Sequence, residues 1–339
     1  MNLSTFDFPF DPSLIATRPA EPREQARLLV VDRRTGSLSH HRVADLPMVL
    51  SPGDLLIGND TKVLPARVAA RKAGSGGRVD LLFVRPHSDT EWSVLAKGRL
   101  PVGQVLELTD EARAVIIRRN AEETVVRVES RKPVREVMES IGRMPLPPYI
   151  KREPEAADRE WYQTSYAAAE GAIAAPTAGL HLTASIRRQL AARGIDWATV
   201  TLHVGLGTFK PVTAEAIEQH TMDAEWATVS AETAALVRRA KAEGRRIIAV
   251  GTTSVRTLES SLDESGQVTA RTGETRLYIT PGYRFRAVDG MLTNFHFPKT
   301  TLLMLVSALA GVEPMREAYR TAVQERYRFY SYGDAMLIL

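Results

Sequence analysis

The segment from residue 63 to residue 150 constrains the fold most, because its residue pattern differs from that on either side. Short runs rich in β-branched residues follow one another there, separated by Gly, Asp and Asn at regular intervals: RVDLLFVRP, EWSVLAKGRL, QVLELTD, RAVIIRRN and TVVRVES. This spacing is typical of a small antiparallel barrel or sandwich. The segment ends in MPLPPYI, residues 144–150, whose three prolines stop regular structure and suit a rigid crossover.

The flanking sequence alternates between helix and strand patterns. Thr183 is placed to cap a helix that ends at Gly194, and Ser230 to cap a second helix that ends at Gly244. We expect strands in DWATVTLHVG and RRIIAVG, a hairpin in ARLLVVDRRTGSLSHHRV, and a strand that enters the barrel in GDLLIGNDTKVLPARV.

Together these patterns predict an α/β fold with two domains. Both termini form a larger α/β domain, residues 1–62 plus 151–339, and a small antiparallel β-barrel domain, residues 63–150, is inserted between them. A chain of 339 residues is long enough for two such domains.

Composition excludes several classes of protein. There are no cysteines, which rules out disulfides, thiolate nucleophiles and cysteine zinc sites and fits a reducing cytoplasm. The N-terminus lacks the cationic start and apolar run of a secretory signal. The longest apolar run is far shorter than the ~20 residues of a membrane span. We therefore expect a soluble, cytoplasmic protein without membrane contact. We also expect a monomer, although composition does not determine the oligomeric state.

The net charge of +4 is not spread evenly along the chain. Residues 63–150 hold 15 basic and 11 acidic residues, whereas the remainder holds 29 of each. The excess of positive charge in the barrel segment favours contact with a polyanion, although an excess of four charges also arises by chance.

Six segments are richer in polar residues and glycine than a scaffold requires: 58–67, 175–183, 201–212, 250–260, 293–301 and 327–336. Four of them follow or end a predicted strand. Loops at strand ends of an α/β domain converge, so these segments are expected to form one ligand site.

The segment GTTSVRTLES places Thr252, Thr253 and Ser254 at the start of a helix that follows a buried strand. The first amides of a helix lack partners and its dipole favours negative charge, so this is a natural carboxylate site. Arg256 adds a fork that is able to grip the same group. A simple helix cap is the alternative, and it would need only one hydroxyl.

Three of the seven histidines, His181, His203 and His296, lie inside these polar segments. No two share a metal-ligand spacing, so acid–base or hydrogen-bonding roles suit them better than metal binding. HVGLGTFK is not a dinucleotide fingerprint, because Lys210 stands where the third glycine would be.

The stretch TNFHFPKTTLLMLVSALAG joins a polar group to a continuous apolar run. We expect a buried helix with Pro298 at its start and Thr300 or Thr301 as its cap. Such a helix would hold Asn294 and His296 rigidly in front of it.

Seven long motifs of the chain, NDTKVLPARV, MPLPPYI, APTAGLHLT, TLHVGLGTFKPV, GTTSVRTLES, TNFHFPKTTLLMLVSALAG and YRFYSYGDAM, closely resemble one family across essentially the whole sequence. It is the S-adenosylmethionine:tRNA ribosyltransferase-isomerase family of queuosine biosynthesis. One motif departs from the family pattern: Met-His-Ser-Glu is replaced here by Met222-Asp223-Ala224-Glu225.

The resemblance implies an α/β fold with an inserted β-barrel, which agrees with the pattern above, and a specific reaction. The ribosyl part of S-adenosylmethionine, a co-substrate, would move to 7-aminomethyl-7-deazaguanine at the wobble position of a partner tRNA. It would be isomerised there to give epoxyqueuosine, with release of adenine and methionine and without a metal. This reaction requires a base that removes the C5′ proton beside the sulfonium and an acid that protonates the departing adenine.

On this resemblance we assign roles to individual residues. The acid–base candidates are His181, His203 and His296. The methionine carboxylate is assigned to Thr252, Thr253, Ser254 and Arg256, and the sulfonium or the ribose hydroxyls to Glu225 and Asp334. Further substrate contacts are assigned to Thr177, Gly179, Gly205, Gly207 and Asn294. The tRNA contacts are assigned to Lys62, Arg67, Arg71 and Lys72.

Two other interpretations stay open. The altered motif at 222–225 would suit a paralogue that uses S-adenosylmethionine on another acceptor. The basic barrel segment would suit a tRNA-binding module without catalysis, but histidines and Thr/Ser loops are not what phosphate binding requires.

Overall fold

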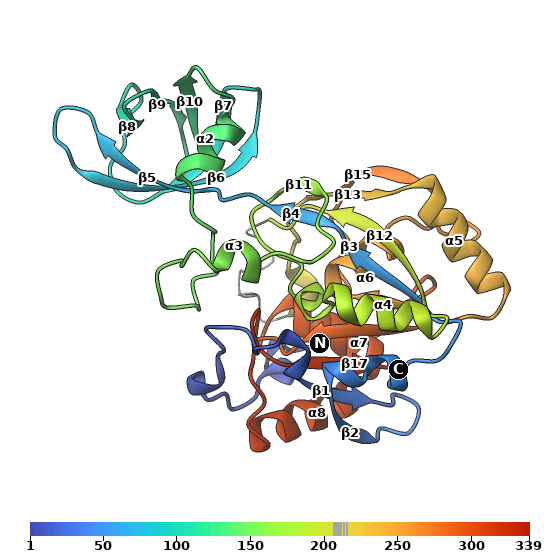
Figure 1. Ribbon diagram of the computed structural model, residues 1–339. Helices are drawn as coiled ribbons and strands as arrows, with labels where there is room; N and C mark the ends of the chain where they lie inside the picture. The colour runs from blue at the N-terminus through green and yellow to red at the C-terminus, as the bar shows by residue number, and fades with distance from the viewer. Residues whose placement is uncertain (122, 206–211, 213, 215) are drawn as a thin grey trace.

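The computed structural model describes residues 1–339 except 122, 206–211, 213 and 215. Figure 1 shows a larger body built on one extended sheet and a smaller barrel that stands away from it. The N- and C-termini both lie on the larger body.

The larger body is organised by a nine-stranded sheet with the strand order β15-β13-β12-β3-β14-β16-β17-β1-β2. The four central strands β12, β3, β14 and β16 run parallel to one another. The strand bounds are β1 Arg27–Val31, β2 Leu38–Arg42, β3 Leu55–Asn59, β12 Asp196–Leu202, β13 Glu225–Val229, β14 Ile247–Val250, β15 Arg271–Thr275, β16 Gly290–Asn294 and β17 Ala335–Ile338.

Helices cover both faces of this sheet, because the apolar side chains of its strands alternate between two cores. Leu29 of β1 packs into the core that α5, α6, α7 and α8 cover, whereas the neighbouring Leu28 packs into the core that α4 covers. The α-helix bounds are α1 Leu46–Val49, α2 Val134–Ile141, α3 Asp158–Trp161, α4 Ala184–Ala192, α5 Ala231–Ala242, α6 Thr252–Glu259, α7 Thr301–Ala310 and α8 Val312–Gln324.

The smaller body is a closed six-stranded antiparallel barrel with the order β10-β7-β6-β5-β8-β9. Its inward-facing residues, such as Val68, Leu81, Phe83 and Val126, form a separate core. The bounds are β5 Arg67–Lys72, β6 Arg78–Pro86, β7 Glu91–Ala96, β8 Val105–Thr109, β9 Ala112–Arg119 and β10 Thr124–Ser130. The α/β fold with an inserted antiparallel barrel is therefore confirmed, while the boundaries at 62 and 150 stay a prediction.

The helix caps expected from the sequence are present. The Thr183 hydroxyl accepts from the Ile186 amide at the start of α4, and the Ser230 hydroxyl accepts from the Thr233 amide at the start of α5. Thr300 caps α7 through the Leu303 amide. Helix α7 is nearly buried all round, with only two of its ten residues partly exposed.

Two local predictions were wrong. Pro298 is not the first residue of α7 but lies in the turn before its cap. The strand expected to enter the barrel is divided: Leu55–Asn59 forms β3 at the centre of the main sheet, because both of its faces are apolar and buried. Thr61–Val63 forms β4, which pairs with β11, Ala169–Ala172, and only β5 joins the barrel.

Candidate functional site

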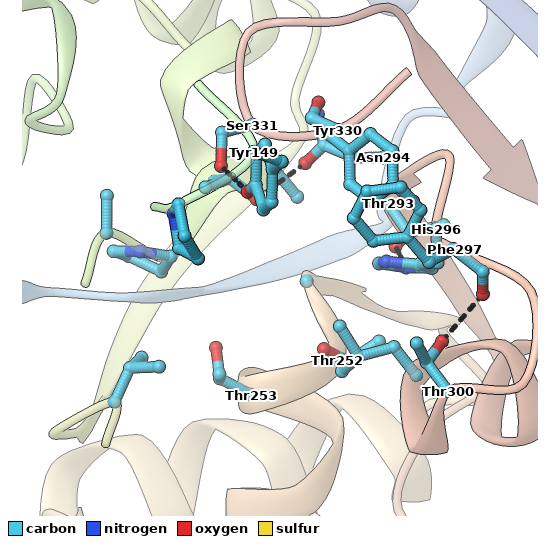
Figure 2. A pocket seen from close by; sticks show the side chains of 18 residues that line it. Tyr149, Thr252, Thr253, Thr293, Asn294, His296, Phe297, Thr300, Tyr330 and Ser331 are labelled. Atoms are coloured by element: carbon cyan, nitrogen blue, oxygen red, sulfur yellow. Dashed lines mark hydrogen bonds between the residues drawn. The ribbon is translucent and has the colours of Figure 1, made fainter. Parts of the chain in front are cut away.

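A cavity of about 330 Å³ lies at the carboxyl ends of the central parallel strands. Five of the six polar segments contribute to its wall, together with the proline-rich crossover after the barrel. Figure 2 shows the aromatic residues on one side of it and, on the other, Thr252 and Thr253 of α6 with Thr300, the residue before α7. It is lined by Pro148, Tyr149, Ala175, Pro176, Thr177, Ala178, Val204, Gly251, Thr252, Thr253, Thr293, Asn294, His296, Phe297, Thr300, Leu302, Tyr330 and Ser331.

The threonine side of the cavity begins where β14 ends. Gly251 turns the chain with φ +89°, a conformation that favours glycine, and α6 starts directly after it. Thr252 and Thr253 line the cavity, and Asn59 at the end of β3 donates to the Thr253 hydroxyl at 3.1 Å. The N-cap position of α6 is Gly251, which has no side chain to cap the helix. This part of the predicted carboxylate site therefore faces the cavity.

Ser254, assigned to the same carboxylate, is placed elsewhere. Its side chain is fully buried, and its hydroxyl donates to the Val250 carbonyl at 2.8 Å. Each helical residue turns the side-chain direction by about 100°, so three consecutive hydroxyls do not share one face. The assignment of Ser254 to the ligand is corrected for this reason.

Arg256 is used by the protein itself. Its Nη1 forms a buried ion pair with Glu225, and its Nε donates to the Leu277 carbonyl at 3.0 Å. Glu225 also accepts from the Gly205 amide at 3.0 Å. The fork of Arg256 is thus not free to grip a carboxylate with two nitrogens, and Glu225 is already balanced by a cation. Neither residue lines the cavity.

Asn294, the last residue of β16, joins three segments of the site. Its Oδ1 accepts from the Thr177 hydroxyl at 2.9 Å, and its Nδ2 lies 3.1 Å from the Tyr330 carbonyl. The same nitrogen lies 3.2 Å from His181 Nε2. An amide buried with its bonding groups occupied holds these loops in one arrangement. Thr177 and Asn294 both line the cavity.

Two of the three candidate histidines are buried and uncharged at neutral pH. Burial lowers the pKa of His296 to about 3, and burial with the nearby Arg328 and Arg23 lowers the pKa of His181 to about 3. His296 lines the cavity and its Nε2 lies 2.8 Å from the Thr293 hydroxyl, whereas His181 lies behind Asn294. Neither ring is an imidazolium near pH 7, so general acid catalysis does not suit them.

His203 lies outside the cavity. Its Nδ1 is 2.8 Å from the Thr61 hydroxyl, and burial lowers the pKa of the ring against the opposing effect of Asp60. The ring fits against Gly171, where an added Cβ would approach it to 2.9 Å. The structure therefore does not bring the three histidines together in one catalytic group.

Gly179 and Asp334, also assigned to the substrate, lie away from the cavity wall. Gly179 packs so closely that an added Cβ would lie 2.1 Å from the Tyr166 hydroxyl, which is a packing role. Asp334 is buried and accepts from the Arg27 and Arg328 amides, so it braces the chain near its C-terminus rather than facing a ligand. Gly207 lies outside the described residues.

The aromatic side of the cavity was missed by sequence reasoning. Tyr149, Phe297 and Tyr330 pack against one another, with 4.6 Å between the ring centroids of Tyr149 and Tyr330. Tyr149 lies 2.5 Å from the Ser331 hydroxyl, which fixes the crossover to the C-terminal segment (Figure 2). The sequence signal for these aromatic residues was their position in MPLPPYI, TNFHFPKTT and YRFYSYGDAM, segments that stand out for their prolines or polar residues.

Two of the four assigned tRNA contacts have acidic partners. Lys62 pairs with Glu170 at 2.9 Å, and Arg67 pairs with Asp80 at 2.6 Å. Lys72 instead donates to the Arg99 carbonyl at 2.8 Å. Arg71, the fourth, is exposed on the barrel.

Among the described residues, no helix has both the length and the apolar composition that a membrane span requires. The same residues contain no group of three or more His, Cys, Asp or Glu side chains that could hold a metal ion.

A cavity outside the carboxyl ends of parallel strands, in an α/β body with an inserted barrel, is typical of an α/β enzyme that binds a small molecule. The comparisons with known proteins identify the family. The sequence model described as queuosine biosynthesis protein matches residues 3–338, and the chain belongs to this family of enzymes.

The relatives match over their full lengths. The S-adenosylmethionine:tRNA ribosyltransferase-isomerase of Moorella thermoacetica is 46% identical, with 100% of both chains covered. The protein of the same name from Cupriavidus metallidurans is 47% identical over 100% of this chain and 98% of the relative. The crystal structure of S-adenosylmethionine tRNA ribosyltransferase from Thermotoga maritima is 34% identical, with a TM-score of 0.58, and covers 99% of this chain and 100% of its own.

Proposed function

We propose that this enzyme transfers the ribosyl moiety of S-adenosylmethionine to 7-aminomethyl-7-deazaguanine at the wobble position of a tRNA and isomerises it. The products are epoxyqueuosine-tRNA, adenine and methionine. The observation that carries the proposal is full-length identity of 44–47% to relatives that bear the name of this activity.

The cavity supports binding of one nucleoside-sized ligand. About 330 Å³ is at the lower end of the roughly 300–1,000 Å³ typical of small-molecule sites. Its aromatic side, Tyr149, Phe297 and Tyr330, offers a surface on which the adenine of S-adenosylmethionine stacks. Its opposite side offers hydroxyl groups and helix amides.

The methionine carboxylate is proposed to bind where α6 begins. Thr252 and Thr253 line the cavity there, and the amides of the first turn have no side-chain cap. Free amides at a helix N-terminus attract an anion through both hydrogen bonds and the helix dipole. This keeps the two threonines of the original assignment and releases Ser254 and Arg256 from it.

The acid–base roles are revised by the burial of the histidines. His296 is held neutral in the cavity, so we propose that it orients the ligand by hydrogen bonding with its imidazole. His203 is partly exposed, and burial has lowered its pKa, so its neutral imidazole is able to accept a proton at pH 7. It remains our candidate for the base that acts on a substrate reaching beyond the cavity.

The paralogue that acts on another acceptor is the second candidate. It rests on the altered motif, in which Asp223 is exposed and lies outside the cavity wall, while Met222 is buried next to Arg256. Neither Asp223 nor Ala224, the two altered residues of the motif, lines the cavity, and this favours the first proposal.

The test uses purified protein, S-adenosylmethionine and a tRNA that carries the aminomethyl base. We expect stoichiometric release of adenine and a tRNA nucleoside whose mass increases to that of epoxyqueuosine. A reaction without tRNA and one with a tRNA that carries guanine are the controls. Binding of S-adenosylmethionine without adenine release from the correct tRNA would favour the paralogue, and tRNA retention without S-adenosylmethionine binding would favour a binding module.

A further inference from the structure

We infer that the barrel grips the sugar–phosphate backbone of the tRNA with four cations gathered around the loop of residues 97–103. This barrel basic cluster consists of Lys72, Lys97, Arg99 and Arg119. The inference rests on the proposed function, because it takes the tRNA of that reaction as the partner. It keeps Lys72 from the sequence-based assignment, which placed the tRNA contacts at the start of the barrel, and adds Lys97, Arg99 and Arg119.

Hydrogen bonds to the loop backbone bring the cations together. Lys72, at the end of β5, donates to the carbonyl of Arg99 at 2.8 Å. Arg119, at the end of β9, donates to the carbonyls of Gly98 at 3.0 Å and Leu100 at 3.2 Å. Three consecutive carbonyls thus bind two cationic side chains from different strands, and the exposed Lys97 and Arg99 belong to the loop itself.

The loop is fixed rather than loosely attached. The Gly103 amide donates to the Ile116 carbonyl of β9 at 2.8 Å, and the Gln104 amide donates to the Pro101 carbonyl at 3.0 Å. The side chain of Leu100 is buried in the barrel core. A fixed loop presents its charges at a constant spacing, which reduces the entropy lost when a rigid polyanion binds.

The four cations lack carboxylate partners in the part of the chain that the structure describes. Most other barrel arginines have one: Arg113 pairs with Glu129, Arg118 with Glu123 and Arg127 with Glu91. Like charges placed side by side repel one another, and a bound polyanion removes that repulsion. Four cations without a carboxylate partner among the described residues therefore gather at this one loop.

Another part of the barrel is unsuited to phosphate. A groove there contains Arg71, Arg78, Arg113 and Arg143, but its carboxylates outnumber them: Asp80, Glu107, Asp110, Glu111, Glu129 and Glu153. Its arginines are balanced by acidic neighbours, as in the pair of Arg113 with Glu129. Arg71, one of the assigned tRNA contacts, belongs to this groove and is excluded from the cluster for that reason.

The residues around the loop favour backbone contact over base recognition. Leu95 and Val102 are exposed by 51% and 62%, and both are aliphatic. The cluster contains no aromatic side chain on which a base could stack. Cations with aliphatic neighbours suit the phosphates and riboses of a helical RNA segment, which position the tRNA without reading its sequence.

The test compares two double variants that remove the same charge. Lys97→Ser with Arg99→Ser alters the cluster, and neither side chain is bonded to another described residue, so the barrel is expected to fold normally. Arg33→Ser with Arg34→Ser removes two exposed cations from the turn between β1 and β2, on the opposite side of the molecule in Figure 1. Binding of an unmodified tRNA transcript is measured between 50 and 300 mM salt, because the salt dependence of the affinity reports the electrostatic contribution to binding.

For the cluster variant we expect the slope of log affinity against log salt to fall in magnitude by about 1.5, since each lost phosphate contact contributes roughly 0.7–0.9. Affinity at low salt should fall roughly tenfold to hundredfold. The KM for tRNA should rise with unchanged kcat and unchanged affinity for S-adenosylmethionine. The control variant should match the wild type in all these measurements.

An unchanged salt slope and an unchanged tRNA affinity in the cluster variant would overturn the inference. The cluster would then bind another partner, such as an acidic protein, or none. An equal loss in both variants would also overturn it, because net charge rather than this surface would then be responsible. Failure of the proposed function is recognised separately, since the wild-type protein would then release no adenine although the cluster variant still lost tRNA affinity.

Discussion

Arg256 and Glu225 form a buried ion pair beside the cavity, linking helix α6 to strand β13. Both side chains are about 95% buried, and each makes a further hydrogen bond to the backbone, Arg256 to Leu277 and Glu225 to Gly205. The pair thus fixes α6, which carries the threonine side of the cavity, against strand β13 of the sheet.

Arg256→Ala should therefore act on stability. Removal of one partner breaks a buried ion pair, which costs about 3–5 kcal/mol. The double variant Arg256→Met with Glu225→Gln should recover most of that loss, because it replaces both members of the pair by uncharged side chains. Denaturant unfolding of the three proteins measures this. A fully stable Arg256→Ala protein with weakened S-adenosylmethionine binding would instead restore the arginine as a ligand-binding residue.

The hydroxyls at the start of α6 allow a matched comparison. Thr252→Val keeps the side-chain shape but removes a hydroxyl from the cavity, and we expect S-adenosylmethionine affinity to fall roughly tenfold, as for a hydrogen bond to a charged group. Ser254→Ala removes a hydroxyl bonded to Val250 and should cost about 1 kcal/mol of stability with unchanged affinity. Calorimetric titration and thermal unfolding separate the two effects, and equal affinity losses in both variants would contradict the geometry.

The aromatic side of the cavity is expected to bind adenine. Tyr149→Ala should weaken both S-adenosylmethionine and free adenosine by roughly tenfold, because stacking of a base on an aromatic ring is worth about 1–3 kcal/mol. Free methionine should bind with unchanged affinity. Tyr149→Phe keeps the ring and serves as the control for loss of the bond to Ser331. If adenosine binds equally well to the wild type and to Tyr149→Ala, the base lies elsewhere.

The sequence predicted where in the fold the site lies better than it predicted which side chains face the cavity. The parallel strands β3, β12, β14 and β16 end at one edge, so loops chosen only for their polarity converge there. The direction in which each side chain points could not be predicted from the polarity of these segments. Ser254 turns back to Val250 because of helix geometry, and Arg256 meets Glu225 across 31 positions of sequence, a pairing that only tertiary structure determines.

Buried His296 predicts how stability depends on pH. Its folded-state pKa of about 3 lies below the ordinary value near 6.5. As pH falls below 6.5, the unfolded chain therefore binds a proton at this residue that the folded chain does not bind. The contribution of the neutral ring to the free energy of unfolding is fully present above pH 6.5 and is lost progressively between pH 6.5 and 3. His296→Gln should lose roughly 2 kcal/mol less than the wild type between pH 7 and pH 5. Denaturant unfolding at both pH values measures the difference, and parallel losses would show that this imidazole is protonated in the folded protein.

His203 is the remaining candidate for acid–base chemistry, and its position separates binding from turnover. The ring lies outside the cavity wall, with Nδ1 near the Thr61 hydroxyl. His203→Ala should therefore leave S-adenosylmethionine affinity and thermal stability nearly unchanged while lowering adenine release by roughly a hundredfold, as for loss of a general base. Thr61→Val is the matched control: it removes the hydroxyl partner of the ring and should lower turnover by a smaller factor.

A catalytic His203 also predicts that the acidic limb of the wild-type pH–rate profile is absent in His203→Ala. Normal adenine release from that variant would remove His203 from the catalytic residues and leave a packing role against Gly171.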